Sequence, residues 1–517
     1  MAGADYITDV QYTGHFYAHL APMWLNYIAA INGARPRPAA QEFTYCELGC
    51  GKGVTAAQLA DLYPRGRFYA VDMNPEHIRH AAGLAEAGGL ANLTPLAKSF
   101  VELPAMDLPQ FDFIALHGVW SWVPEAVRAE ILEVLRRKLK PGGLVMVSYN
   151  AMPGWAHILP LREMMQAYIG ALEGDSLARA RAALGYLKFL ADNNADYFAA
   201  NPAAAAHVAD LLKQDLRYVA HEYVTRHGEA FYFSQVEKAM AGIGLAYAGN
   251  LMTELNYAQL MARAPFQKLL AGAPSRSIFE THRDFIANTR FRNDLYAAQP
   301  APRPDPAQTP ELLAGNRFAL TQVPERIELK GREGQLAFDL TPEEGRVKAI
   351  LAFLASGPAT AAQIHEALGA AQPLAETVRF LMNLVVVGRI APCAAQEPPP
   401  PGWSRLNRAL LGQALRSGES TMYAGCPALG NALELPIAYA VSIQLANDCG
   451  SAGEAGEAGA AMLAGAERSL GLPDGKGGQH AASVPELREY FAAAWRAMRE
   501  PASPEARHVR LLGLLPA

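Results

Sequence analysis

One stretch limits what this chain can fold into more than any other: residues 43–53, which read Phe-Thr-Tyr-Cys-Glu-Leu-Gly-Cys-Gly-Lys-Gly. The apolar run predicts a strand, and Gly49, Gly51 and Gly53 then follow at every second position. Glycines leave the backbone bare, so that a ligand can lie on it, and they permit a positive φ. A helical pattern follows directly, and a helix there directs free N–H groups at the turn. We therefore predict a strand, a ligand-binding turn and a helix.

The alternation of strand-like and helix-like segments continues after this turn. Strands are predicted at 67–71, 111–117 and 144–149, and helices at 75–87 and 124–139. Alternation of this kind is typical of a parallel sheet covered by helices. The predicted fold class is therefore α/β: a Rossmann-like, mostly parallel sheet with helices on both faces.

At 517 residues the chain should contain roughly three or four domains. Ala-rich helical patterns dominate after the predicted sheet, and three short helices followed by a strand suggest a winged-helix unit. Proline-rich linkers at 299–306 and 398–401 separate these regions, and the low-complexity tract 450–465 is expected to be flexible. The predicted units are an N-terminal aromatic lid or packing helix (1–40), a catalytic domain (41–156), a helical middle domain (157–298), a winged-helix-like domain (311–395) and a C-terminal helical region (403–517).

Composition excludes several classes of protein. The chain is 51% apolar without a run of about twenty uncharged apolar residues, so we expect no membrane insertion. The first residues lack a secretory pattern, and the five cysteines form no CxxC pair, so a cytoplasmic protein without a disulfide framework or metal site is predicted. A net charge of -5, and balanced charges in the winged-helix-like unit, give no reason to expect nucleic acid as a partner.

The residues around the glycine turn indicate which ligand it binds. The spacing is G-x-G-x-G, not the G-x-G-x-x-G of dinucleotide-binding turns, and Glu47 directly precedes it. S-adenosylmethionine explains both features, because it has no pyrophosphate but carries an amino group that a carboxylate can recognise. Asp72 ends the second strand, where a carboxylate can accept hydrogen bonds from ribose hydroxyls, although it could also cap the next helix.

With the Lys140-Pro141-Gly142-Gly143 turn before the last strand, residues 43–150 resemble the class I S-adenosylmethionine-dependent methyltransferases. The resemblance implies S-adenosylmethionine as the cofactor and assigns its binding to three groups of residues. They are Glu47, Gly49, Cys50, Gly51 and Gly53 for the methionine part, Asp72 for the ribose, and Met73, Ser99, Phe100 and Val101 for the adenine, with His117 as a further contact.

Other segments are similar to bacterial methyltransferases that carry a regulatory domain after the catalytic one. These segments are 116–124, 148–155, His221-Glu222-Tyr223, 231–233 and 290–296. Members of that group include rickettsial protein lysine methyltransferases that modify outer-membrane proteins. The resemblance therefore implies a lysine-bearing protein as substrate.

Methyl transfer to an amine needs alignment and a free lone pair on nitrogen. An apolar, aromatic pocket favours the neutral amine, and aromatic residues follow the strands where ligands bind in open α/β sheets. The candidate catalytic residues are Trp120, Trp122, Tyr149 and the nearby Trp155 as pocket walls, His117 as a cofactor contact or base, and Asn150 to orient the acceptor. A structural role for His117 is an equally good interpretation.

Two alternative functions stay open at this point. One is methylation of oxygen or nitrogen in a small molecule, and the other is a cofactor-binding regulator without turnover. The amphipathic helices are also compatible with a homodimer.

Overall fold

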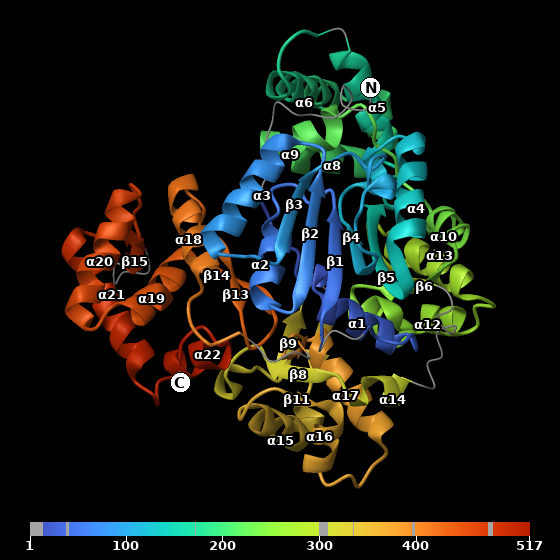
Figure 1. Ribbon diagram of the computed structural model, residues 1–517. Coiled ribbons are helices and arrows are strands. Elements are labelled where there is room, and N and C mark those ends of the chain that lie inside the picture. The colour runs from blue at the N-terminus through green and yellow to red at the C-terminus, as the bar shows by residue number, and fades with distance from the viewer. Residues whose placement is uncertain are drawn as a thin grey trace.

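The structure is a computed structural model that describes residues 14–37, 41–170, 172–298, 309–333, 336–394, 399–473 and 479–516. At its centre lies a seven-stranded sheet in the order β3-β2-β1-β4-β5-β7-β6 (Figure 1). The strands are β1 (Phe43–Leu48), β2 (Gly66–Asp72), β3 (Leu93–Ala97), β4 (Phe111–Leu116), β5 (Leu139–Asn150), β6 (Leu245–Asn250) and β7 (Phe291–Ala298). The first five pair in parallel, and β7 is antiparallel to both β5 and β6. The predicted Rossmann-like, mostly parallel sheet is confirmed.

Helices cover both faces of this sheet because successive side chains of a strand point to opposite faces. In β1, Tyr45 belongs to a core shared with α1 (Pro22–Ile31), α2 (Val54–Leu62) and α3 (Pro75–Gly88). The neighbouring Cys46 belongs to the opposite core, which α4 (Glu125–Lys138) and α10 (Phe233–Ala241) complete. Strands buried on both faces explain the continuous apolar runs of the sequence.

Two strands of the sheet come from the segment that the sequence predicts as helical. β6 contains small residues, and β7 carries Arg292, Asn293 and Asp294 in its middle, so neither has the apolar pattern of a buried strand. Apart from these strands the segment is mainly helical, and its first helices lie above one end of the sheet, at the top of Figure 1. Its elements there are α5 (Leu159–Ile169), α6 (Ser176–Asp192), α7 (Asp196–Ala200), α8 (Pro202–Leu211), α9 (Leu216–Val219) and the π-helical turn Ala220–Val224.

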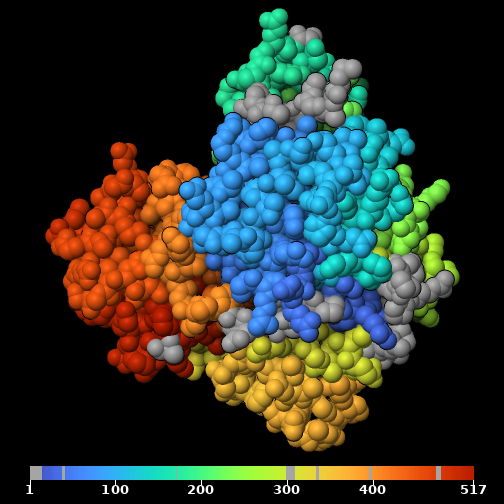
Figure 2. All heavy atoms as spheres, viewed as in Figure 1, coloured from blue at the N-terminus to red at the C-terminus, as the bar shows by residue number. Residues whose placement is uncertain are grey.

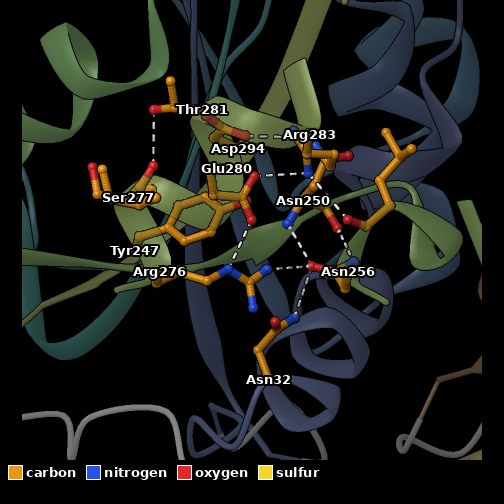
Figure 3. A network of polar contacts seen from close by, with 12 residues as sticks. Asn32, Tyr247, Asn250, Asn256, Arg276, Ser277, Glu280, Thr281, Arg283 and Asp294 are labelled. Carbon is orange, nitrogen blue, oxygen red and sulfur yellow. Dashed lines mark hydrogen bonds and ion pairs between the residues drawn. The ribbon is translucent and has the colours of Figure 1, made fainter. Parts of the chain in front are cut away.

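Buried charges hold β7 in the sheet. The guanidinium of Arg292, which is fully buried, bonds Glu280 (2.7 Å) and Asp284 (2.8 Å) of α13 (Arg276–Ala287) and Asp294 (2.8 Å) of its own strand. Figure 3 shows the neighbouring part of this network, in which Arg276 contacts both Glu280 and Asn256. Asn256 in turn accepts a hydrogen bond from Asn32, which caps the end of α1. The network therefore links α13, the segment around Asn256 and the end of α1.

The remaining regions, gold and red in Figure 2, lie beside the blue N-terminal part of the chain and pack on α1, α2 and α3. Residues 309–394 form a small unit against α1. It is built on a three-stranded sheet in the order β11 (Ala359–Thr360), β8 (Arg317–Leu320) and β12, with the helices α15 (Glu344–Leu354), α16 (Ala361–Ala367) and α17 (Leu374–Val386). Three helices and a following strand, β12 (Ile390–Cys393), match the expected elements, whereas the winged-helix identity stays a prediction. In the C-terminal region, α18 (Arg405–Ser417) packs on α3, and β13 (Thr421–Cys426) packs on α2.

The expectation of a flexible tract at 450–465 is wrong. The tract forms α20 (Ala452–Gly465), which packs against α21 (Val484–Arg499). A Cβ on Gly459 would lie 2.4 Å from the Phe491 ring, so the small residues are needed for close helix contact. The expected linker 299–306 lies outside the described residues, as does part of the linker 398–401.

Candidate active site

A cavity of about 460 Å³ opens at the carboxyl ends of β1, β2, β4 and β5, beneath the helices at the top of Figure 1. Ligands of open α/β sheets bind at this edge. The glycine turn and the ends of β1 and β2 line one side, which we call the donor end. Trp122, Trp155 and residues from 207–223 line the other side, which we call the acceptor end.

At the donor end, the three glycines of the turn have different roles. All three have a positive φ: +74° at Gly49, +53° at Gly51 and +71° at Gly53. A Cβ on Gly49 would lie 2.4 Å from Val119, and one on Gly53 would lie 2.5 Å from Ala81. Next to Gly51, however, no atom of the described residues lies within 4 Å of that position. Gly51 therefore leaves the backbone open to a ligand, while the other two allow close packing.

Asp72 fixes the turn and still has hydrogen-bonding capacity. Its carboxylate accepts hydrogen bonds from the backbone N–H groups of Gly51 (2.9 Å) and Asn74 (2.8 Å). His77 Nδ1 lies 3.3 Å from the same carboxylate. A carboxylate has about four lone-pair sites, so it can accept a further hydrogen bond from a ligand hydroxyl.

Glu47 places a carboxylate under the turn. It is 4% exposed, and within the described part of the chain its Oε2 has no hydrogen-bond partner. Burial raises the pKa of Glu47 to about 8, and the charge of Asp72 adds to this shift, while the N–H of Ala56 opposes it. A buried acceptor without a partner is costly, and an ammonium group would satisfy it.

The N-terminal segment both covers the cavity and packs as a helix. Gly14, His15 and Tyr17 line the cavity, while α1 is buried between the sheet and the unit 309–394. The N–H of Tyr17 donates to Thr55 Oγ1 (3.2 Å), and its ring centroid lies 4.0 Å from that of His117. The start of the described segment therefore lies at the cavity and α1 packs beside it, and the lid role stays a prediction.

Aromatic rings and one amide form the acceptor end nearest the sheet. Trp122 and Trp155 pack edge to face with centroids 6.2 Å apart. Asn150 is 4% exposed, and its Nδ2 has no hydrogen-bond partner among the described residues. Burial lowers the pKa of His117 to about 4, and His15 and His19 add to the shift, so its imidazole is neutral at physiological pH.

The far wall of the acceptor end comes from residues to which the sequence assigned no role. They are His207, Tyr218, His221, Glu222, Tyr223, Arg290 and Phe291. Tyr223 is bonded to His207 Nε2 (2.7 Å), and the guanidinium of Arg290 lies 3.2 Å from His157 Nε2. Burial raises the pKa of Glu222 to about 8, against the opposing charge of Arg162. Motif similarity marked 221–223 and 290–296, but that signal did not show that residues of these segments line the same cavity as the glycine turn.

The structure brings most of the predicted site residues together. Those that line the cavity are Glu47, Gly49, Cys50, Gly51, Asp72, Met73, Phe100, His117, Trp122, Asn150 and Trp155. Five others do not: Gly53, Ser99, Val101, Trp120 and Tyr149.

Each of these five residues has a physical reason for its position. Tyr149 alternates with Asn150 along β5, so it points to the opposite face and donates to Asp294 (2.6 Å). Trp120 is buried in the core beneath α4. Ser99 bonds Glu102 (2.8 Å) and Val101 is 58% exposed, both outside the cavity. Gly53 allows the turn to pack closely against Ala81 of α3.

Comparisons with known proteins agree with this architecture. Residues 40–182 match the family described as a methyltransferase domain, and residues 215–298 match the predicted methyltransferase regulatory domain. An uncharacterized protein of Synechocystis sp. is 34% identical over 363 residues, which span 70% of this chain and 71% of the relative. An uncharacterized protein of Rickettsia prowazekii is 30% identical over 45% of this chain and 92% of its own length.

Among solved structures, PKMT2 from Rickettsia typhi in complex with AdoHcy has the same fold. It superposes with a TM-score of 0.70 at 21% identity and covers 97% of this chain and 99% of its own. The chain belongs to the class I S-adenosylmethionine-dependent methyltransferases that carry a methyltransferase regulatory domain. It is therefore an enzyme with S-adenosylmethionine as its methyl donor.

No helix in the described part of the chain is long and apolar enough to cross a membrane. Across the same described ranges, no three His, Cys, Asp or Glu side chains are grouped so that they could hold a metal ion.

Proposed function

We propose that this methyltransferase transfers the methyl group to lysine side chains of proteins. The aromatic acceptor end carries the proposal: Trp122, Trp155 and Phe291 form apolar walls that suit the aliphatic stem of a lysine. Exclusion of water by such walls also favours the neutral amine that methylation requires. The resemblance to rickettsial protein lysine methyltransferases, and the fold shared with PKMT2, support the same acceptor class.

The donor end holds S-adenosylmethionine, which supplies an electrophilic methyl group on sulfonium. Glu47 receives its ammonium group, because a cation satisfies the buried Oε2. Asp72 accepts hydrogen bonds from the ribose hydroxyls with the lone pairs that Gly51 and Asn74 leave free. The bare backbone of Gly51 allows the methionine part to lie against the turn.

His117 and Asn150 lie between the two ends. The lowered pKa of His117 keeps it neutral, so it acts as a hydrogen-bonding group and adds no positive charge beside the sulfonium. The Asn150 Nδ2 donates to a carbonyl of the acceptor, which orients the lysine.

Incubation of the purified protein with methyl-labelled S-adenosylmethionine and a bacterial lysate tests the acceptor class. We expect label in protein bands and, after acid hydrolysis, recovery of that label as methyl-lysine. Label confined to small molecules would contradict the proposal and favour the small-molecule alternative. Label in protein that mild alkali releases would identify methyl esters and would contradict it as well.

A further inference from the structure

Glu222 is an acidic residue in the wall of the acceptor end of the cavity. It lies in the π-helical turn Ala220–Val224, which packs against α5, α6 and α9. Single π-helical turns are frequent at functional sites because they displace one side chain from the regular helix surface. Glu222 lines the cavity together with Tyr218 and Tyr223.

The two carboxylates Glu47 and Glu222 line the same cavity from different elements. Glu47 is the last but one residue of β1, whereas Glu222 belongs to the helical cap, formed by α5–α9 and the π-helical turn Ala220–Val224. The hydroxyl of Tyr17 lies within electrostatic range of both, since both carboxylates raise its pKa, which burial and these charges bring to about 12. Glu47, with its unpartnered Oε2, is assigned to the ammonium group of the methyl donor, which leaves Glu222 as the carboxylate of the helical cap for a second cation.

Tyrosines and two arginines lie around Glu222. One of these arginines, Arg290, lines the same wall and acts on Tyr218 and Tyr223, and its guanidinium lies 3.2 Å from His157 Nε2. Tyr17 approaches from the N-terminal segment, Tyr218 from α9, and Tyr223 from its own turn. Arg162 of α5 contributes the positive charge that acts on Glu222, but its own guanidinium is bonded to the Thr225 carbonyl. From α6, the residues buried in the shared core are apolar or small. His207, which is bonded to Tyr223, is held neutral by burial, which lowers its pKa to about 4.

We propose that the Glu222 carboxylate binds the ammonium group of the acceptor side chain and removes one of its protons. This inference rests on the proposed amine acceptor. The proton moves from nitrogen to the Glu222 carboxylate, which leaves a neutral amine and a carboxylic acid. The amine lone pair then forms the new N–C bond while the C–S bond breaks, and the electron pair of that bond stays on sulfur. The products are a methylated ammonium and S-adenosylhomocysteine.

The raised proton affinity of Glu222 suits this role. A free lysine has a pKa of about 10.4, so an ordinary carboxylate near 4 is a poor base for its ammonium group. Burial raises the pKa of Glu222 to about 8, which narrows this difference. General-base assistance of this kind typically accelerates a reaction about 10²- to 10⁴-fold.

Substitution Glu222→Gln tests the inference, with Glu163→Gln as the matched control. Glu163 is exposed on α5 and also acts on Arg162, so the control removes a similar charge outside the cavity. The full chain is assayed with methyl-labelled S-adenosylmethionine and acid-denatured bacterial protein, and methyl-lysine is quantified after hydrolysis between pH 7 and 10.

At pH 8 we expect Glu222→Gln to lower the initial rate by about 100-fold or more, and Glu163→Gln to leave it unchanged. The residual rate of Glu222→Gln should rise about tenfold per pH unit up to pH 10, because only lysine that is already neutral can react. The wild-type rate should level off above pH 9. A rate within threefold of wild type at pH 8, or a loss that is equal at pH 8 and 10, would overturn the inference.

A binding measurement separates this inference from the proposed function. Nα-acetyl-lysine N-methylamide and its norleucine analogue are titrated into the protein saturated with S-adenosylhomocysteine. Wild type should bind the lysine probe at least tenfold more tightly than the norleucine probe, and Glu222→Gln should not discriminate. Equal binding of both probes by wild type would refute the role of Glu222, whereas absence of methyl-lysine from the labelled products would refute the proposed function.

Discussion

The donor and acceptor ends of the cavity are built in different ways. The donor end is made largely of backbone: a turn of three glycines with positive φ, held to Asp72 by the N–H of Gly51. The acceptor end is made of large side chains from segments that lie far apart along the chain. A site built from local backbone conformation keeps a readable sequence pattern, whereas a site assembled from distant side chains does not.

The ends also differ in what supports them. The glycine turn is anchored by two hydrogen bonds to the Val71 carbonyl, from Gly49 (2.8 Å) and Cys50 (3.0 Å). The acceptor end borders the start of β7, where Arg290 and Phe291 line the cavity and Arg292 is buried among carboxylates. Backbone hydrogen bonds therefore support the donor end, and a buried ion network supports the acceptor end.

The largest expected effect comes from breaking that ion network. Arg292→Ala leaves Glu280, Asp284 and Asp294 buried without their shared cation, so we expect the free energy of unfolding to fall by about 3–5 kcal/mol. Urea unfolding followed by circular dichroism measures this change. Arg290→Ala, two residues away and exposed, should stay within about 0.5 kcal/mol of wild type. Equal losses for the two variants would show that the network does not carry this part of the fold.

A second comparison is between two glycines of the donor turn. Gly49→Ala introduces a methyl group 2.4 Å from Val119 at a positive φ, so we expect a loss of about 2–4 kcal/mol of stability. Gly51→Ala meets open space and should lose only about 1–2 kcal/mol through its backbone strain, yet weaken S-adenosylhomocysteine binding. Thermal unfolding and calorimetric titration measure the two effects. If Gly51→Ala bound the ligand as wild type does, the methionine part would not lie on this backbone.

A ligand that binds at the donor end should displace a proton from Glu47. Because the pKa of Glu47 is raised to about 8, this carboxyl is mostly protonated at pH 6.5, and binding of a ligand ammonium should displace close to one proton. Affinity for S-adenosylhomocysteine should therefore rise as pH increases from 6 toward 8. Calorimetry at pH 6.5 in two buffers of different ionisation enthalpy counts the protons. Glu47→Gln should abolish the release and Glu222→Gln should preserve it; the opposite pattern would exchange the roles of the two ends.

The difference between local signals and contacts formed only in the folded protein explains how far the sequence predicts the structure. The expected helices 75–87 and 124–139 agree with α3 (Pro75–Gly88) and α4 (Glu125–Lys138), because apolar periodicity and flanking prolines are local signals. β7 escaped prediction because its buried Arg292 and Asp294 are stabilised by partners in α13, β5 and β6, which the local pattern cannot show. The expected flexible tract 450–465 is a helix for a similar reason, since its glycines become favourable only against α21.

In the site, the cavity brings together predicted residues of both ends, but it leaves out Gly53, Ser99 and Val101 at the donor end and Trp120 and Tyr149 at the acceptor end. Glu47, Gly51 and Asp72 line the cavity as expected, because strand ends and glycine spacing fix their positions. Tyr149 does not, since the one-residue alternation of a strand decides which face it occupies. Glu222 had no assigned role, because only the tertiary packing of the helical cap brings its side chain to the cavity.

Titration of S-adenosylhomocysteine into Asp72→Asn and Glu222→Gln, with wild type beside them, tests the separation of the two ends most directly. Asp72→Asn removes a charged acceptor at the donor end, a loss of about 1.5–3 kcal/mol, so the dissociation constant should rise at least tenfold. Glu222→Gln lies at the acceptor end and should bind within twofold of wild type. Unchanged binding by Asp72→Asn, or an equal loss in both variants, would contradict a cavity with separate donor and acceptor ends.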